Sequence, residues 1–403
     1  MATPKVSVII PTYNRRELLR RSLFHLTRQR LPAGEFEVVV ADDGSSDDTK
    51  EMVESYRDRL PVKYCYQADL GYRVSAARNA GARLAEAPIL AFLDSGVQVG
   101  PDWLTRHLAA HRARTEPIAV TGYAFGYNPP NPMPGIGEAL AEMLPEEVVE
   151  RYRDDPAFLD IRHEQMARCG FEMDRRLLPW TLFWPINCSL RAADFHAVGG
   201  FDEDYVVWGL EDMEFGLRLW QRGVSFEISR DAWAVESPHE RDEARNWEWM
   251  RRNIRIFLAR HPEPVVEIGW ALLDSGLIWE WEDEYRRLLD WTGRIADRDV
   301  TAEVVAAVSD VPAGHRIAVV GCGGLRPEAV PGSVLIDFDR TLLPEGGLHA
   351  IGLRTALPGE SVDTVVLTSR LAGLWERWSP QLLAEARRLG HDVRVCDGLG
   401  EAA

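Results

Sequence analysis

VSVIIPTYNR (residues 6–15) and FEVVVADDGS (residues 36–45) decide the fold, because each is an apolar run that stops at a turn. Both runs have the length of a buried strand. A proline closes the first run, and two aspartates close the second. Leucines at helical spacing between the runs predict a helix over residues 17–28. The order strand, helix, strand is the beginning of a βαβ unit.

The same alternation continues as far as residue 96. Strands are expected over residues 63–67 and 88–93, and helices from residue 47 and over residues 75–84. This succession predicts an α/β fold with a mixed, mainly parallel open sheet flanked by helices. Ligands of such sheets bind beyond the carboxyl ends of the strands, where the acidic residues of this chain gather.

The bulk composition limits the classes of function. The chain has 403 residues and a formal net charge of −17, which argues against a nucleic-acid partner. It has no apolar run of about 18 residues, so no membrane span is expected. Its first residues lack the apolar core of a signal peptide, so a cytoplasmic location is expected. Five scattered cysteines predict neither a disulfide framework nor a structural zinc site.

Three segments are expected along the chain. A first α/β domain covers residues 1–262, a helical linker covers residues 263–300, and a smaller Rossmann-like α/β domain covers residues 301–403. The last domain contains IAVVGCGG (residues 317–324), a strand running into a glycine-rich turn, and VLIDFD (residues 334–339), a strand ending in acid. A glycine turn and an acid on the neighbouring strand suit a nucleoside ligand.

Tyr13, Asp42 and Asp43 are candidates for binding a nucleoside at the edge of the first sheet. A carboxylate at a strand end can accept hydrogen bonds from a base or a ribose hydroxyl, and a tyrosine ring offers a stacking face. Each segment alone is also typical of a strand-to-helix turn in which an aspartate caps the helix. Their occurrence on consecutive strands favours the binding site.

Asp94, after the fourth strand, and His239, in a polar loop, are candidate ligands of a divalent cation. Carboxylate oxygens suit a hard cation, and imidazole suits manganese or a similar ion. A second acid two residues after Asp94 would complete the clamp, but Gly96 stands there. Taken singly, Asp94 could be a turn residue and His239 a solvated side chain.

WGLEDMEFG (residues 208–216) places acids at the beginning of a predicted helix. Glu211 and Asp212 are the first of these acids, and Trp208, directly before them in the turn, offers a flat face on which a sugar ring could pack. Acids at a helix N-terminus are also favoured by the helix dipole alone.

Five motifs in order resemble those of an inverting GT-A glycosyltransferase of family two. QADLGYRVSAARNAG (residues 67–81) is similar in particular to the catalytic domains of bacterial chondroitin and heparosan polymerases. The resemblance covers roughly residues 4–260. The five motifs are VSVIIPTYNR, DDGS, DSG, NCS and WGLEDMEFG, at residues 6–15, 42–45, 94–96, 187–189 and 208–216.

The resemblance implies a GT-A sheet that binds a nucleoside diphosphate sugar, a UDP-sugar before others, together with Mn²⁺ or Mg²⁺. Asp212 would be the general base with Glu211 beside it, and an ordinary carboxylate pKa would be adequate for that role. Asp94 and His239 would face the metal, and Trp208, Trp184 and Asn187 the acceptor. The implied donor-binding residues are Pro11, Tyr13, Arg15, Asp42, Asp43, Asp69, Arg78, Asn79, Asp94 and Ser95.

Gly96 departs from the family pattern, in which an Asp-x-Asp motif follows this strand. Three explanations are open: Asp94 and His239 suffice for the metal, another acid such as Glu236 replaces the missing one, or the metal is used weakly. The first is preferred, and stimulation of activity by Mn²⁺ or Mg²⁺ is expected.

Two competing functions stand beside the transferase. A decayed fold could bind a nucleotide sugar or act as a scaffold without turnover. The unit at residues 301–403 resembles an S-adenosylmethionine-dependent methyltransferase, which would make the chain bifunctional. That unit is short, so a degenerate accessory domain serving a homodimer or acceptor binding is preferred. The acceptor is expected to be soluble: a small molecule, a peptide or an oligosaccharide.

Overall fold

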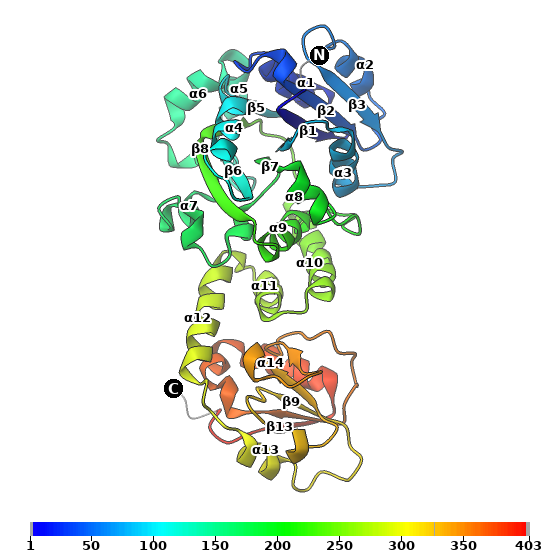
Figure 1. The fold of residues 1–403 in the computed structure, drawn as a ribbon, viewed down its shortest axis with the longest axis vertical. Coiled ribbons are helices and arrows are strands. Elements are labelled where there is room, and N and C mark those ends of the chain that lie inside the picture. The colour runs from blue at the N-terminus through cyan, green and yellow to red at the C-terminus, as the bar shows by residue number, and fades with distance from the viewer. Residues whose placement is uncertain (1–2, 326, 400–403) are drawn as a thin grey trace. The chain divides into compact units, whose positions relative to one another are not determined.

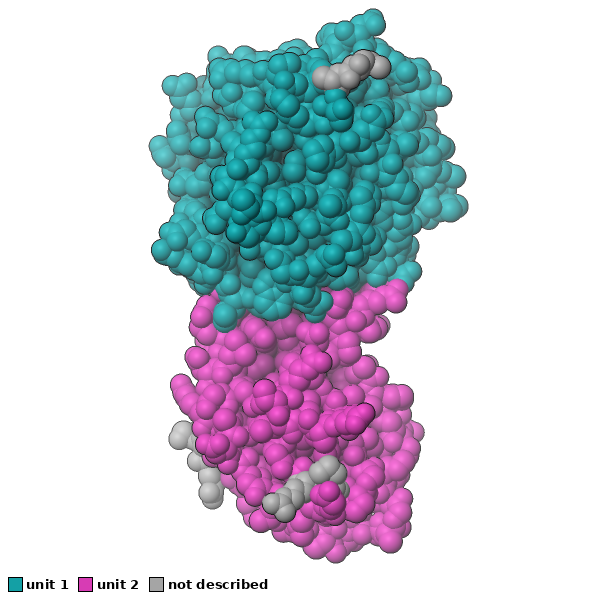
Figure 2. All heavy atoms as spheres, in the orientation of Figure 1, with its two compact units in different colours: residues 1–249 teal, residues 250–403 magenta. Residues whose placement is uncertain are grey.

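The chain forms two compact units, which Figure 2 colours separately. The structure is a computed structural model that describes residues 3–325 and 327–399. Unit 1 comprises residues 1–249 and unit 2 residues 250–403. The finer division at residues 262 and 300 stays a prediction. No helix in these described ranges is long and apolar enough to cross a membrane.

Unit 1 is built on one eight-stranded sheet (Figure 1). In chain order its strands are β1 (Val6–Thr12), β2 (Phe36–Asp42), β3 (Val62–Tyr66), β4 (Ile89–Leu93), β5 (Val97–Val99), β6 (Ile118–Phe125), β7 (Asn187–Arg191) and β8 (Ser225–Glu236). Their order in the sheet is β3-β2-β1-β4-β7-β6-β8-β5. The first four are mutually parallel, β7 is antiparallel to β4 and β6, and β8 is parallel to β6 and antiparallel to β5. The prediction of a mixed, mainly parallel open sheet is confirmed.

Helices cover the sheet closely. β1 and β2 are buried at every position, as expected for parallel strands that are covered on both faces. A Cβ on Gly81 would lie 2.7 Å from Cγ2 of Ile9, so the glycine allows its helix to approach β1. The helices of this unit are α1 (Arg16–Leu26), α2 (Thr49–Glu54), α3 (Val74–Leu84), α4 (Trp103–Arg112), α5 (Ile136–Glu142), α6 (Pro145–Tyr152), α7 (His163–Arg168), α8 (Ala192–Ala197) and α9 (Glu211–Gln221).

The pairing of β5 with β8 brings two distant loops together. Val97 lies opposite Glu236 in antiparallel register. The backbone N of Ser237 donates to the carbonyl of Gly96 at 3.2 Å. The loop after β4 is therefore beside the loop after β8, and a site at the edge of the sheet can draw side chains from both.

Unit 2 contains a smaller parallel sheet with the order β11-β10-β9-β12-β13. This is a doubly wound order that reverses between β9 and β12. The strands are β9 (Ile317–Val320), β10 (Val334–Asp337), β11 (Leu348–His349), β12 (Thr364–Leu367) and β13 (Asp392–Val395). The helices are α11 (Pro264–Asp274), α12 (Trp281–Arg294), α13 (Thr301–Ala307) and α14 (Ala372–Leu389), and α10 (Glu243–Arg260) contains the boundary between the units.

Candidate active site

The loops that follow β1 and β2 are tied together through Asn14. Its backbone N donates to Oγ of Ser45 at 2.8 Å, and its Oδ1 accepts from the backbone N of Ser46 at 2.8 Å. Asn14 has a φ of 49°, in the left-handed region that asparagine tolerates better than most side chains. The two loops therefore form one platform at the carboxyl ends of their strands.

Asp42 and Asp43 hold this platform from inside. Asp42 is buried, with one oxygen accepting from two backbone N–H groups of the turn that follows and the other from the hydroxyl of Tyr64 at 2.7 Å. Asp43 is also buried and accepts from the side chain of Gln67 and from the backbone N of Arg73. Burial raises the pKa of Asp43. Both carboxylates are engaged within the protein, and their contacts shape the surface that a ligand would meet.

The exposed face of the platform carries Tyr13 and Asp69. The hydroxyl of Tyr13 donates to Asp69 at 2.8 Å, and Asp69 also accepts from the backbone N of Gly71 at 3.0 Å. Tyr13 is 44% exposed, so its ring can stack on a flat ligand. A Cβ on Gly44, whose φ is +100°, would lie 2.5 Å from Cα of Asp69. The turn after β2 thus approaches the Asp69 segment as closely as only glycine allows.

Arg78, in α3, connects two acids from distant parts of the chain. Its Nη2 donates to Asp94 at 3.0 Å and its Nη1 to Glu211 at 3.1 Å. Arg78 and Glu211 have side chains that are 5% and 6% exposed, whereas the Asp94 side chain is 39% exposed. Burial alone would lower the pKa of Arg78, but the two carboxylates raise it, so the guanidinium stays charged. One buried cation therefore fixes the beginning of α9 relative to the loop after β4.

Asp212 lies in the first turn of α9, directly after Glu211. Glu211 is fixed from two sides, because it accepts from Arg78 and from the backbone N of Gly209 at 3.1 Å. Asp212 is half-buried and accepts from the backbone N of Met213 at 2.8 Å. Burial, together with the neighbouring charge of Glu211, raises the pKa of Asp212 to about 8. An ordinary pKa would be adequate for a base, and in this structure the pKa of Asp212 lies above that range because of its burial and the charge of Glu211.

The loop after β8 carries a second polar cluster, made of Glu236, His239 and Arg241. Arg241 forms an ion pair with Glu236, and its Nε donates to Nε2 of His239 at 3.1 Å. Burial and nearby arginines lower the pKa of His239 to about 4, so the imidazole is neutral. Burial raises the pKa of Glu236 to about 7, and the charge of Asp94 contributes to that rise. The cluster is thus electrostatically linked to the loop after β4.

Asp94 and His239 offer a metal ion one carboxylate and one neutral imidazole. Nε2 of His239 acts as an acceptor toward Arg241, and this is the lone pair that a metal would need. Among residues 3–325 and 327–399, no group of three or more His, Cys, Asp or Glu side chains is arranged to hold a metal ion. A Mn²⁺ or Mg²⁺ ion held by this pair would have to take its remaining ligands from substrate oxygens and water.

Gly96 has a structural reason for its identity. Its φ is +96°, which L side chains rarely adopt, and a Cβ here would lie 3.2 Å from the side chain of Leu18. The position that holds an acid in the Asp-x-Asp pattern is therefore unfavourable for one in this backbone conformation.

Two further predicted donor residues hold the framework. Nδ2 of Asn79 donates to the carbonyl of Phe201 at 2.8 Å, and its Oδ1 accepts from the backbone N of Phe201 at 2.9 Å. Oγ of Ser95 donates to the carbonyl of Pro11 at 2.7 Å, which joins the loops after β4 and β1. The side chains of Asn79 and Ser95 thus position segments that border the site, and Pro11 contributes its backbone carbonyl.

Asn187 was expected on the acceptor side, and its surroundings argue against that role. The residue is 0% exposed. Its Oδ1 accepts from Nε1 of Trp103 at 2.9 Å and lies 3.0 Å from Nε2 of His107, while its Nδ2 donates to the carbonyl of Ala232 at 2.8 Å. Because both halves of the amide are used inside the protein, we leave Asn187 out of the proposed acceptor site.

Trp184 lies in an aromatic and cationic group next to the loop after β8. Its ring is 5.8 Å from that of Tyr127 and 4.9 Å from the guanidinium carbon of Arg162. Tyr127 in turn lies 5.4 Å from the guanidinium of Arg241. Trp208 is half-buried and directly precedes the glycine that supports Glu211. Both tryptophans thus border residues of the candidate site.

Sequence reasoning missed three members of the site: Tyr72, Tyr127 and Arg241. The ring of Tyr72 lies 6.2 Å from that of Trp249, and the tyrosine interacts electrostatically with Glu211 and Asp94. Arg241 stands two residues after His239, which is a local clue. Its proximity to Asp94 depends on the pairing of β5 with β8, which no local sequence pattern predicts.

Comparison with known proteins decides the family. A validoxylamine A glucosyltransferase from Streptomyces hygroscopicus subsp. jinggangensis (strain 5008) is 40% identical over 406 residues, which cover 97% of this chain and 96% of that protein. A second, from subsp. limoneus, is 42% identical and covers 97% and 90%. Residues 7–174 match the model of glycosyl transferase family 2, and residues 168–238 match that of the N-terminal domain of galactosyltransferase. The chain belongs to glycosyl transferase family 2.

This glycosyltransferase also has the expected likeness to polysaccharide synthases. It is 32% identical to the chondroitin synthase of Pasteurella multocida (strain Pm70) over 243 residues, which cover 55% of this chain and 24% of that protein. The predicted likeness to chondroitin polymerases is confirmed for this part of the chain. Unit 1, with its mixed sheet, has the GT-A fold of the family.

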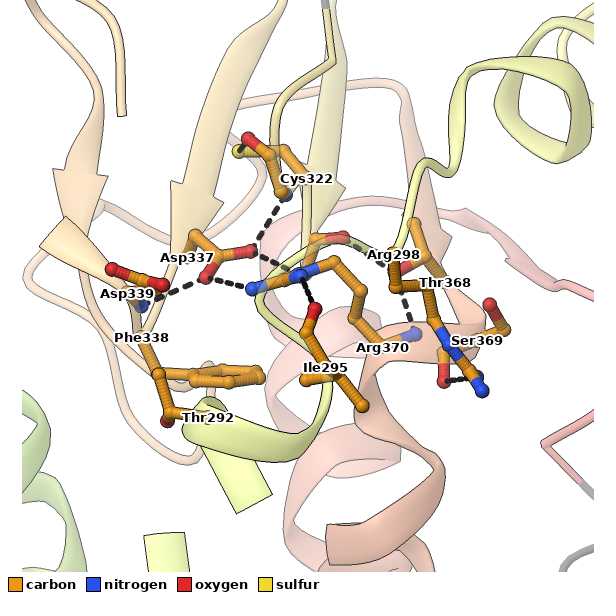
Figure 3. A network of polar contacts seen from close by, with 12 residues as sticks. Thr292, Ile295, Arg298, Cys322, Asp337, Phe338, Asp339, Thr368, Ser369 and Arg370 are labelled. Carbon is orange, nitrogen blue, oxygen red and sulfur yellow. Dashed lines mark hydrogen bonds and ion pairs between the residues drawn. The ribbon is translucent and has the colours of Figure 1, made fainter. Parts of the chain in front are cut away.

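Beside the glycine turn of unit 2, Asp337 and Arg370 form an ion pair, which Figure 3 shows with its neighbouring hydrogen bonds. Asp337, at the end of β10, accepts from the backbone N of Gly323 at 2.7 Å and from Nε of Arg370 at 3.0 Å and its Nη2 at 3.2 Å. Nη1 of Arg370 donates to the carbonyl of Ile295 at 2.8 Å. Both charged side chains are 0% exposed. This is a fully buried ion pair with its hydrogen bonds satisfied.

Arg370 occupies the space beside the turn where a nucleoside would lie. A Cβ on Gly323 would be 2.7 Å from Cδ of Arg370, so the arginine rests directly against the glycine. A nucleoside ligand would need both that space and the carboxylate of Asp337. The contacts of Arg370 therefore argue against the bifunctional alternative with a methyltransferase.

Proposed function

We propose that this enzyme transfers a hexose, with inversion at the anomeric carbon, from a UDP-sugar to a small soluble acceptor. The observation that carries the proposal is the position of Asp212. It stands beside Glu211, which Arg78 links to Asp94. A base and a donor-side acid are thus held in one connected group.

In the proposed reaction Asp212 accepts the proton of an acceptor hydroxyl. The hydroxyl oxygen forms a bond to the anomeric carbon of the donor as the bond from that carbon to the diphosphate breaks, and the nucleoside diphosphate leaves with the electron pair. A carboxylate whose pKa is raised to about 8 is a stronger base than an ordinary one, which favours this proton transfer near neutral pH.

The proposed donor site uses Tyr13, Asp69 and Arg15 on the exposed face of the platform, with Asp42 and Asp43 holding it. Asp94 and His239 would hold Mn²⁺ or Mg²⁺, which would supply positive charge to the diphosphate. Stimulation by either metal is expected, and full activity after exhaustive chelation would contradict the metal assignment.

The names of the two full-length relatives suggest the substrates. Both are validoxylamine A glucosyltransferases with 40–42% identity across at least nine-tenths of each chain. We therefore propose glucose as the transferred sugar and validoxylamine A, or a molecule of the same kind, as the acceptor. The likeness to chondroitin synthase covers 24% of that protein, so it supports the donor side and no polymer product.

The decisive experiment is a panel of UDP-sugars offered with validoxylamine A and scored by released UDP. UDP-glucose is expected to be used best, and NMR of the product should show inversion relative to the donor. Asp212→Asn should abolish turnover and keep UDP binding. Release of no nucleotide with any donor would instead favour the alternative of a nucleotide-sugar-binding protein without turnover, which the glycine at position 96 keeps open.

A further inference from the structure

Arg241 joins three residues of the candidate site, namely Glu236, His239 and Tyr127. It follows β8 in the chain, and its side chain is 20% exposed. The guanidinium pairs with Glu236, donates to Nε2 of His239 and lies 5.4 Å from the ring centre of Tyr127. It therefore covers the nitrogen of His239 that a metal ion would use.

The surroundings of Arg241 belong to the donor side of the site. Ser237, in the same loop, is hydrogen-bonded to Gly96. Arg15, after β1, interacts electrostatically with both Asp94 and Arg241. Two guanidinium groups from different loops thus lie within electrostatic range of the carboxylate that would face the diphosphate.

We propose that Arg241 binds the diphosphate of the nucleotide sugar, leaving Glu236 and His239 when the donor enters. The inference rests on the proposed function and adds a leaving-group residue to it. A guanidinium is the side chain best matched to phosphate oxygens, because its planar fork donates two parallel charge-assisted hydrogen bonds.

The absence of an acid at position 96 makes a cationic side chain near the diphosphate more important for donor binding. With Gly96 in place of a second carboxylate, a metal ion would have fewer protein ligands, and more of the diphosphate charge must be balanced by side chains. Movement of Arg241 toward the diphosphate also uncovers Nε2 of His239. One displacement therefore brings a cation to the leaving group and exposes a metal ligand.

The experiment compares UDP with UMP by calorimetry, in EDTA, so that any phosphate effect comes from the protein. Wild type is expected to bind UDP more tightly than UMP. Arg241→Gln should weaken UDP binding roughly tenfold to a hundredfold, the range for losing charge-assisted hydrogen bonds, and leave UMP binding nearly unchanged. Arg241→Lys should recover part of the loss because it keeps the charge without the fork.

The matched control is Arg106→Gln, which removes a surface arginine of α4 that is 50% exposed and pairs with Asp231 at 3.7 Å. It should bind both nucleotides as wild type does. Equal UDP affinity in Arg241→Gln and wild type would overturn the inference, and so would equal losses for UDP and UMP, which would mark a structural role. Wild type that binds neither nucleotide, in EDTA and again after addition of Mn²⁺, would remove the proposed function as well.

Discussion

Nη1 of Arg78 lies 3.1 Å from Oε1 of Glu211, and both side chains are almost fully buried. The same guanidinium reaches Asp94 at 3.0 Å. Arg78 is therefore the connection between the donor side of the site and the helix that carries Asp212. In the proposed reaction the acceptor must be held in line with the bond that breaks, so we expect the geometry of transfer to depend on that connection.

We expect Arg78→Lys to lower kcat/KM by roughly 10²-fold, because lysine keeps the charge but cannot bond both carboxylates, and small misplacements of reacting groups carry losses of that order. Arg78→Met should in addition destabilise unit 1 by about 3–5 kcal/mol by leaving Glu211 buried and unpaired. Steady-state kinetics and urea denaturation measure the two effects.

The control for Arg78 is Arg83→Met in the same helix. The Arg83 side chain is 63% exposed and pairs with Glu203 at 3.7 Å, and exposed pairs contribute little. Activity and stability close to wild type are expected for this variant. If Arg78→Lys matched it in both measurements, the bridging role of Arg78 would be wrong.

The pH dependence of activity should follow Asp212. A base works only when deprotonated, and the pKa of Asp212 is raised to about 8. We therefore expect kcat/KM to fall as pH is lowered below about 8, and Asp212→Asn to lose roughly 10²–10⁴-fold at about pH 8 and above, with a smaller difference at lower pH where Asp212 of the wild type is protonated. Initial rates from pH 5.5 to 9.5 test both statements.

The free energy of unfolding should also depend on the ionisation of Asp212, but in the opposite direction to activity. Because the folded pKa of Asp212 lies above its unfolded value, its favourable contribution is present below the unfolded pKa and is lost as pH rises through about 8. Asp212→Asn should thus gain stability relative to wild type at pH 9. Thermal unfolding at pH 5 and pH 9 would contradict this if the difference between the two proteins stayed constant.

Gly96→Asp restores the acid of the family pattern, and we expect it to fail. The φ of +96° and the approach of Leu18 make the substitution strained, at about 1–3 kcal/mol of stability. Gly34→Asp is the control, because a Cβ there meets nothing within 4 Å and its φ lies outside the strained range. Chemical denaturation of both variants, followed by Mn²⁺ titration, measures the effect. A stable Gly96→Asp enzyme that binds Mn²⁺ more tightly would refute the strain argument.

The position of a side chain at the end of one strand is easier to predict from the sequence than its contacts with side chains from other strands. Asp42, Asp43 and Asp94 follow apolar runs, so their place at one edge of a parallel sheet follows from chain order alone. That the first two face inward depends on Tyr64 and Gln67, which are about 20 residues away in sequence. Their burial could not be read from the motif.

Contacts that depend on antiparallel strand pairing are still harder to predict from the sequence. The loop at residues 237–241 reaches Asp94 because β5 pairs with β8, two strands far apart in the chain. The raised pKa of Asp212 likewise comes mainly from its burial in the folded protein, and the contact of Arg78 with Glu211 beside it spans 133 residues. Neither hydrophobic periodicity nor turn residues carry information about such pairings.

In unit 2, the ion pair between Asp337 and Arg370 should prevent a nucleoside from binding at the glycine turn. We expect no heat of binding when S-adenosylmethionine is titrated into the wild-type enzyme, because Arg370 fills the space beside the glycine turn and engages Asp337.

Arg370→Met should destabilise unit 2 by about 3–5 kcal/mol, since it leaves a buried carboxylate unpaired. Asp337→Asn combined with Arg370→Met should lose less than the sum of the single changes, because neither charge is then left alone. Urea denaturation of the four proteins measures this coupling. Additive losses would mean that the two side chains do not stabilise unit 2 as a pair, and saturable S-adenosylmethionine binding would mean that the arginine yields its place to a ligand.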